Sequence, residues 1–193
     1  MKTDFVSQNL TAGQLNAIVK NLGGEEAALR FLRGELVVQE REFPFHVTGE
    51  LMIQIPALAR PTLEELRKDY SFIRSIERDT SPTDAVTLNL ATILRSNEER
   101  VKGEEYERRI AQKLDLILGF QQAVWLVKNQ DKFPDFMAPL GKIYIDFSGI
   151  VVVVGNGHRG VPCLARDGRR WGLYWYWFGR GFGRYGRLAI SSK

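Results

Sequence analysis

The sequence predicts an α+β protein, and two observations carry this prediction. In residues 12–33 apolar side chains recur at helical spacing. In contrast, eleven of the chain's eighteen glycines lie in residues 141–193, between short runs of strand-forming residues. Hydrophobic residues make up 44% of the 193-residue chain, which is enough for a sizeable core. We therefore expect a helical hairpin at residues 1–34, a mixed helix and strand region at 35–140, and an antiparallel β-meander of about five strands at 141–193. Residues 35–193 form either one domain or two.

The N-terminal region carries the signals of two short helices. Thr11-Ala-Gly-Gln14 has the form of a capping box, in which the side chains of Thr11 and Gln14 exchange hydrogen bonds with backbone N–H groups. The first helix is expected from there to Leu22, because Gly23-Gly24 follows. A second helix is expected over residues 25–33, with Gly34 as its left-handed cap.

This hairpin has the rough size of a helix-turn-helix, with glycine in its turn. A DNA-reading helix brings its first turn toward the phosphates, whereas the second helix here opens with Glu25-Glu26, which phosphate repels. We therefore favour a hairpin that packs within the protein or contacts a protein partner.

The central region mixes predicted helices and strands. Thr62-Leu-Glu-Glu65 repeats the capping-box pattern. The apolar residues that follow recur at helical spacing: Leu63, Leu66, Tyr70, Ile73 and Ile76. The other expected elements are strands at 36–40 and 86–94, a β-hairpin of 43–47 and 51–55 about Thr48-Gly49, helical segments at 104–118 and 120–130, and a helical turn at 133–136.

The C-terminal region is basic and reads as strands at 142–147, 150–154, 161–165, 170–178 and 187–191. Asn156-Gly157 and Asp167-Gly168 are strong signals of hairpin turns. Residues 142–193 hold nine Lys and Arg against two Asp and Glu, although the formal net charge of the whole chain is only +4. Such asymmetry favours an anionic partner for the basic part.

No motif predicts a reaction, a metal site or a cofactor. Gly155-x-Gly157-x-x-Gly160 follows an apolar run, but a predicted strand rather than a helix comes next, so a hairpin is favoured over a dinucleotide site. Cys163 and His158 lack an evident third residue to orient them, and a buried thiol is favoured over a nucleophile. A single cysteine, no signal-peptide pattern and no apolar run of ~20 residues favour a cytoplasmic location.

The strand expected at residues 170–178 is aromatic on both faces. A period of two places Trp171, Leu173, Trp175 and Trp177 on one face, and Tyr174, Tyr176 and Phe178 on the other. A central strand buried on both faces is one explanation. A platform on which bases or a partner's side chains stack is the other.

The loop at residues 179–187 combines arginines, glycines and single aromatic residues, as RGG-type nucleic-acid contacts do. The candidate nucleic-acid-binding residues are Arg180, Phe182, Arg184, Tyr185, Arg187, Arg169 and Arg170. We therefore expect a non-enzymatic protein that binds RNA or single-stranded DNA, with arginines on phosphates and with Phe182 and Tyr185 stacked on bases. The alternative is a protein–protein interaction or structural module in which the aromatic sheet is core.

Two stretches, residues 15–36 and 133–193, resemble a family of uncharacterised bacterial proteins known from metagenomic genomes. The segment Leu140-Gly-Lys-Ile-Tyr-Ile-Asp-Phe-Ser-Gly149 and the run Trp175-Tyr-Trp177 carry most of this resemblance. The resemblance implies a bacterial cytoplasmic protein and attaches no activity, cofactor or site residue.

Overall fold

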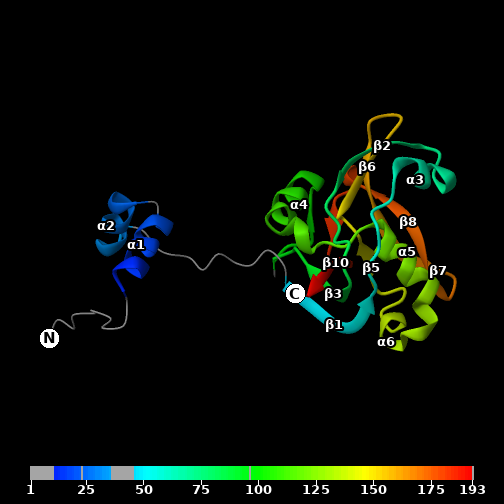
Figure 1. The fold of residues 1–193 in the computed structure, drawn as a ribbon, viewed down its shortest axis with the longest axis horizontal. Coiled ribbons are helices and arrows are strands. Elements are labelled where there is room, and N and C mark those ends of the chain that lie inside the picture. Colours follow the sequence, from blue (N-terminus) through cyan, green and yellow to red (C-terminus); the bar gives the residue numbers. More distant parts are fainter. Residues whose placement is uncertain (1–10, 23, 36–45, 96, 193) are drawn as a thin grey trace. The chain divides into compact units, whose positions relative to one another are not determined.

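The computed structural model describes residues 11–22, 24–35, 46–95 and 97–192 of the chain (Figure 1). Two compact units divide the chain, Met1–Glu42 and Phe43–Lys193. Strands from the expected central and C-terminal regions join in a single sheet of the second unit. The strand expected at residues 36–40 and the first part of the hairpin expected at 43–47 lie outside the described residues.

The first unit is a pair of short helices, α1 (Ala12–Asn21) and α2 (Glu25–Leu32). The capping box predicted at Thr11 is confirmed, because the Thr11 N–H donates to Gln14 Oε1 at 2.8 Å and the Gln14 N–H donates to Thr11 Oγ1 at 3.3 Å. No described residue of α2 is buried. Leu32 is 77% exposed and Leu29 is 50% exposed, so this pair of helices carries its apolar side chains on the surface.

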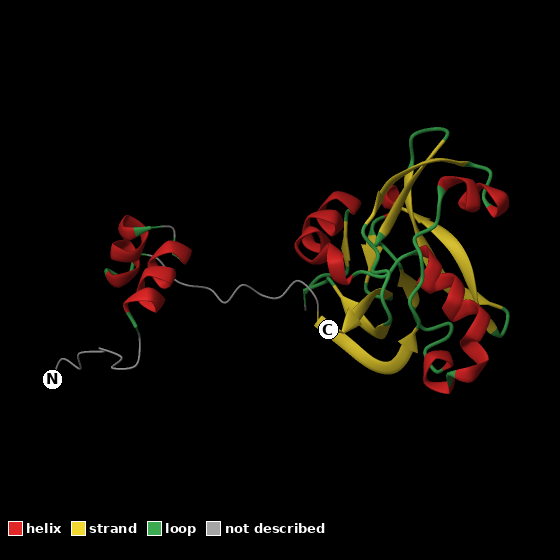
Figure 2. Ribbon diagram, in the orientation of Figure 1, coloured by secondary structure: helices red, strands yellow, loops and turns green. Residues whose placement is uncertain are grey.

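The second unit combines a large sheet with helices on both of its faces (Figure 2). Its strands are β1 (His46–Ile55), β2 (Ile73–Asp79), β3 (Val86–Thr92), β4 (Arg100–Val101), β5 (Tyr144–Asp146), β6 (Ile150–Val154), β7 (Arg159–Asp167), β8 (Arg170–Trp177), β9 (Phe182–Gly183) and β10 (Gly186–Ser192). Its α-helices are α3 (Leu63–Asp69), α4 (Gly103–Ile110), α5 (Phe120–Asn129) and α6 (Pro134–Met137), with 3₁₀-helices at Ala111–Leu116, Gln130–Lys132 and Phe178–Arg180. The α+β class is therefore confirmed.

The strand order is β1-β3-β10-β5-β7-β6-β2, and β8 pairs with β7. The strands β6, β7 and β8 follow one another in antiparallel order, as the turns at Asn156-Gly157 and Asp167-Gly168 predict. The prediction of a simple five-stranded meander is wrong for its first and last strands, β5 and β10. β10 lies between β3 and β5 and runs parallel to β5, because the chain after β8 crosses back through the loop at 179–187 before it rejoins the sheet.

The two faces of the sheet bury separate cores. Leu188 and Ile190 of β10 pack with Tyr106 and Ile110 of α4, whereas Ala189 between them packs with α5 and α6. This alternation is the period of two of a strand that is buried on both faces. On the second face, Leu66 of α3 extends the core toward β2 and β6.

One predicted helix end and one predicted turn are wrong in the central region, and both positions lie at β-bulges. The helix at Thr62 ends at Asp69, and Ile73 and Ile76 belong to the strand β2. The β2–β6 register shifts between Ile73 and Ser75, and the extra residue puts Ile73 and Ile76 on one face at a spacing of three. Likewise Thr48-Gly49 is no hairpin turn, because β1 runs through it with register shifts on β3.

β8 lies at an edge of the sheet, so the interpretation of it as a central strand is wrong. Trp171 is 2% exposed and donates its Nε1–H to the Phe136 carbonyl at 2.9 Å. Farther along, Trp175 is half-buried and stacks on Phe120 with ring centroids 5.9 Å apart. On the other face Tyr174 is 45% exposed. The aromatic strand is therefore core at its beginning and surface at its middle.

Candidate anion-binding site

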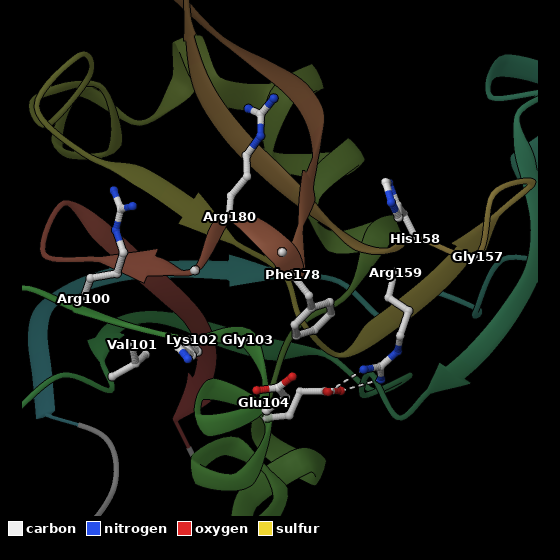
Figure 3. A pocket seen from close by; sticks show the side chains of 13 residues that line it. Arg100, Val101, Lys102, Gly103, Glu104, Gly157, His158, Arg159, Phe178 and Arg180 are labelled. Atoms are coloured by element: carbon white, nitrogen blue, oxygen red, sulfur yellow. Dashed lines mark hydrogen bonds and ion pairs between the residues drawn. The ribbon is translucent and has the colours of Figure 1, made fainter.

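A pocket of about 580 Å³ lies where four segments of the second unit meet. These segments are β4 with the start of α4, the turn between β6 and β7, the 3₁₀-helix after β8, and Gly181. Four cationic side chains line it: Arg100, Lys102, Arg159 and Arg180 (Figure 3). Its lining also includes the His158 imidazole and the Phe178 ring.

The cations of this pocket fall into two kinds. Arg159 is neutralised, because its guanidinium donates to Glu77 and to Glu107 at 2.6 Å each. Arg100, Lys102 and Arg180 form no ion pair or side-chain hydrogen bond with any residue in the described part of the chain. Glu104 is the other carboxylate among the lining residues. The pocket therefore has an excess of positive charge that is free to meet an anion.

Local packing explains why Arg100 reaches this pocket. β4 pairs with β9 over two residues, Arg100 with Gly183 and Val101 with Phe182. Val101 and Phe182 are buried, and Phe182 stacks on Tyr106 of α4 with ring centroids 3.6 Å apart. Strand alternation then directs Arg100 to the opposite side, into solvent.

Gly181 is the residue that this close approach requires. Its φ is +68°, and a Cβ on it would lie 2.8 Å from the Val101 carbonyl oxygen. A side chain at this position would therefore be strained and would push β4 away from the loop. Gly181 thus has a structural role in the loop.

The structure brings some of the seven predicted residues together. Arg180 lines the pocket. Arg184 pairs with Glu99 at 2.9 Å, and its guanidinium lies 5.2 Å from the centre of the Tyr185 ring. Tyr185 is 57% exposed. Arg187 donates to the carbonyls of Arg184 and Gly186, at 2.9 and 2.8 Å, so it holds the shape of the loop.

Two parts of the predicted site are not realised. Phe182 is 3% exposed, so the prediction that it stacks on a base is wrong, because its ring is held between Tyr106 and Phe178. Arg169 and Arg170 lie at the β7–β8 turn, at the opposite end of β8 from Arg180. At roughly 3.3 Å per residue an eight-residue strand separates them by ~25 Å. Arg170 also pairs with Asp131 at 2.7 Å.

Nothing in the sequence indicates that Arg100, Lys102 and His158 line one anion-binding pocket, although His158 is considered there as a partner of Cys163. Arg100 and Lys102 flank a strand of only two residues, and nothing local in the sequence marks its pairing with the distant β9. His158 follows the Asn156-Gly157 turn, and its backbone N–H donates to Asn156 Oδ1 at 3.1 Å. The turn signal predicts that His158 lies at the tip of a hairpin. It does not predict that the start of α4 and the 3₁₀-helix after β8 line the same pocket.

The reactive groups near this pocket serve structure. Cys163 is 3% exposed and burial raises the pKa of its thiol, whereas His158 is exposed. The carboxylates of Glu98 and Glu105 accept hydrogen bonds from Arg109 and Arg108, which lower the pKa of each acid to about 2. These acids are therefore ionised partners of arginines at neutral pH.

Comparison with known proteins adds no family to this geometry. No protein-family model, curated protein or solved structure matches the chain. Within the described residues, each helix is too short or too polar to cross a membrane.

Proposed function

We propose that this protein binds single-stranded nucleic acid and that its function is binding rather than catalysis. The observation that supports this most strongly is that Arg100, Lys102 and Arg180 line one pocket and form no ion pair with a residue in the described part of the chain. Guanidinium and ammonium groups are the usual protein contacts for phosphate oxygens. In this proposal these three side chains hold backbone phosphates.

The exposed Tyr185 ring supports a stacking contact beside the phosphate contacts. Arg184 lies over one face of this ring, so in this proposal a base stacks on the opposite face. A concave pocket of about 580 Å³ has the size of a nucleotide site. Single strands can place an unstacked nucleotide in such a pocket, whereas a duplex keeps its bases stacked inside.

Fluorescence anisotropy with labelled oligouridine and oligothymidine tests the proposal. We expect the triple variant R100Q/K102Q/R180Q to bind more weakly and to lower the slope of log K against log salt by about 2, since each phosphate contact contributes roughly 0.7 for single strands. The matched control is K68Q/R74Q/K142Q, which removes three exposed cations from elsewhere on the same unit. Equal losses in the two variants would show that only net charge matters and would refute a site at the pocket.

A protein-interaction role is the second candidate, and it rests on a different observation. α1 and α2 expose several large apolar side chains: Leu15, Ile18, Leu29, Phe31 and Leu32. Exposed apolar groups gathered on two short helices are typical of a contact surface for another protein. Replacing Leu29 and Leu32 with Gln should then abolish co-purification with a partner and leave oligonucleotide affinity unchanged.

A further inference from the structure

The edge strand β8 has an open side. It pairs with β7 along its full length, from Trp177 opposite Gly160 to Arg170 opposite Asp167. The Trp171 N–H points away from β7, because it donates to Gln130 Oε1 at 2.7 Å. Backbone groups alternate in direction along a strand, so the N–H and C=O groups of Leu173 and Trp175 also point away from β7.

Only the first of these outward positions is protected. Gln130 satisfies both backbone groups of Trp171, since its Nε2 also donates to the Trp171 carbonyl at 3.2 Å. In the described part of the chain no further strand pairs with β8. Residues 171–178 contain no charged side chain. Proteins normally protect an open edge by covering it or by charging it. Among the described residues no further strand covers 173–177, and these five residues carry no charge.

A groove of about 420 Å³ lies beside this open stretch, and its lining residues come mainly from α3 and α5. Leu173 of β8 lines it together with Val124 and Val127 of α5. The Tyr70 and Phe120 rings complete its apolar lining. The groove is therefore an apolar and aromatic cavity that shares a residue with the open edge.

The charges at this groove favour a cationic side chain. Glu65 and Asp69 of α3 line it against a single cation, Lys128. The Glu65 carboxylate accepts from the Thr62 N–H at 2.8 Å, whereas Asp69 forms no ion pair with a described residue. Aromatic faces attract a cation as well, so the Tyr70 ring adds to the same preference.

We propose that residues 173–177 of β8 form a docking site for an extended peptide of a partner protein, which adds to the sheet as a further strand and places a lysine or arginine side chain in the groove between α3 and α5. In this mode the peptide backbone bonds to Leu173 and Trp175, and the alternate side chains of the peptide give specificity.

The test uses the full chain and a pool of acetylated peptides of the pattern Thr-Val-Xaa-Arg-Xaa-Val-Thr, with Xaa any residue except proline. We expect members of the pool to bind and to slow hydrogen exchange at the amides of Leu173 and Trp175. A second pool with glutamate in place of arginine should bind less. Absence of binding by the whole arginine pool, or binding that leaves these two amides unprotected, would overturn the proposal.

Charge reversal tests the groove separately. Asp69→Lys puts a cation at the C-terminal end of α3, where the helix dipole favours it, so the fold should survive. We expect it to weaken binding of the arginine pool by at least about tenfold, because like charges then meet. The matched control Asp84→Lys changes an exposed acid outside the groove and should bind as the wild type does. Equal affinity of the two variants for the arginine pool would contradict the proposal. If the Leu173 amide becomes protected without peptide as the protein concentration rises, the partner of β8 is a second copy of this chain, and the peptide proposal is overturned.

Discussion

Asp146 of β5 offers a sharp test of the physical account of this fold. Its side chain is 2% exposed, and its Oδ1 atom is buried without a hydrogen-bond partner among the described residues. It lies opposite Cys163 of β7, beneath the loop that carries Phe182. Burial raises the pKa of the carboxyl group to about 8. The folded protein therefore holds this group as a neutral acid at neutral pH.

This raised pKa makes the protein less stable as the pH rises. In the unfolded chain the pKa of an aspartic acid is about 3.9. Between these two pKa values the folded state keeps a proton that the unfolded state has lost, so the free energy of unfolding falls by about 1.4 kcal/mol per pH unit. At pH 7 the accumulated loss is on the order of 4 kcal/mol.

Asp146→Asn keeps the shape of the side chain and removes its titration. We expect the variant to be more stable than the wild type by up to about 4 kcal/mol at neutral pH, and to approach the wild type near the pKa of the unfolded acid. Urea denaturation across this pH range measures the difference. Asp84→Asn, at an exposed position, is the control. A variant that gains no stability at neutral pH, or gains the same amount at every pH, would refute the burial argument.

Arg109→Met removes the hydrogen bonds that lower the pKa of Glu98 to about 2, so it should destabilise the fold by roughly 3 kcal/mol at neutral pH. The wild type should lose stability as the pH falls below about 4, and the variant should lose less. Acid denaturation of the two proteins measures both effects. Phe182→Ala should cost roughly 3–5 kcal/mol of stability in urea denaturation, whereas Tyr185→Ala should cost under about 0.5 kcal/mol and weaken only nucleic-acid binding. A fragment of residues 43–193 should keep a single cooperative thermal transition, and its loss would show that the N-terminal helices belong to the main core.

Local signals in the sequence predicted local structure well. The capping boxes at Thr11 and Thr62 form as expected, because each needs only residues three apart. The Asn156-Gly157 and Asp167-Gly168 turns also form, since glycine supplies the positive φ that each turn needs. The helical spacing of apolar residues was misleading near β-bulges. At Ile73 one extra residue gives the apolar residues of a strand the spacing of a helix.

The residues of the candidate site are brought together by pairing between segments far apart in the sequence, and local sequence patterns do not indicate such pairing. Composition pointed to Arg180 and Tyr185, which are accessible. It could not distinguish Tyr185 from Phe182, because only the packing of Phe182 on Tyr106 takes that ring out of solvent. Arg100 enters the site through a two-residue pairing with β9, which no pattern of propensity or turn chemistry marks.

Photo-crosslinking with a 4-thiouridine oligonucleotide, followed by mass spectrometry, locates bound nucleic acid on the protein. We expect crosslinks in the full chain on peptides around Tyr185 and on the peptides that hold Arg100 and Arg180, and we expect R100Q/K102Q/R180Q to remove them. Crosslinks confined to the β7–β8 turn at Arg169, or to residues 1–42, would place nucleic acid elsewhere and contradict the assignment of the pocket.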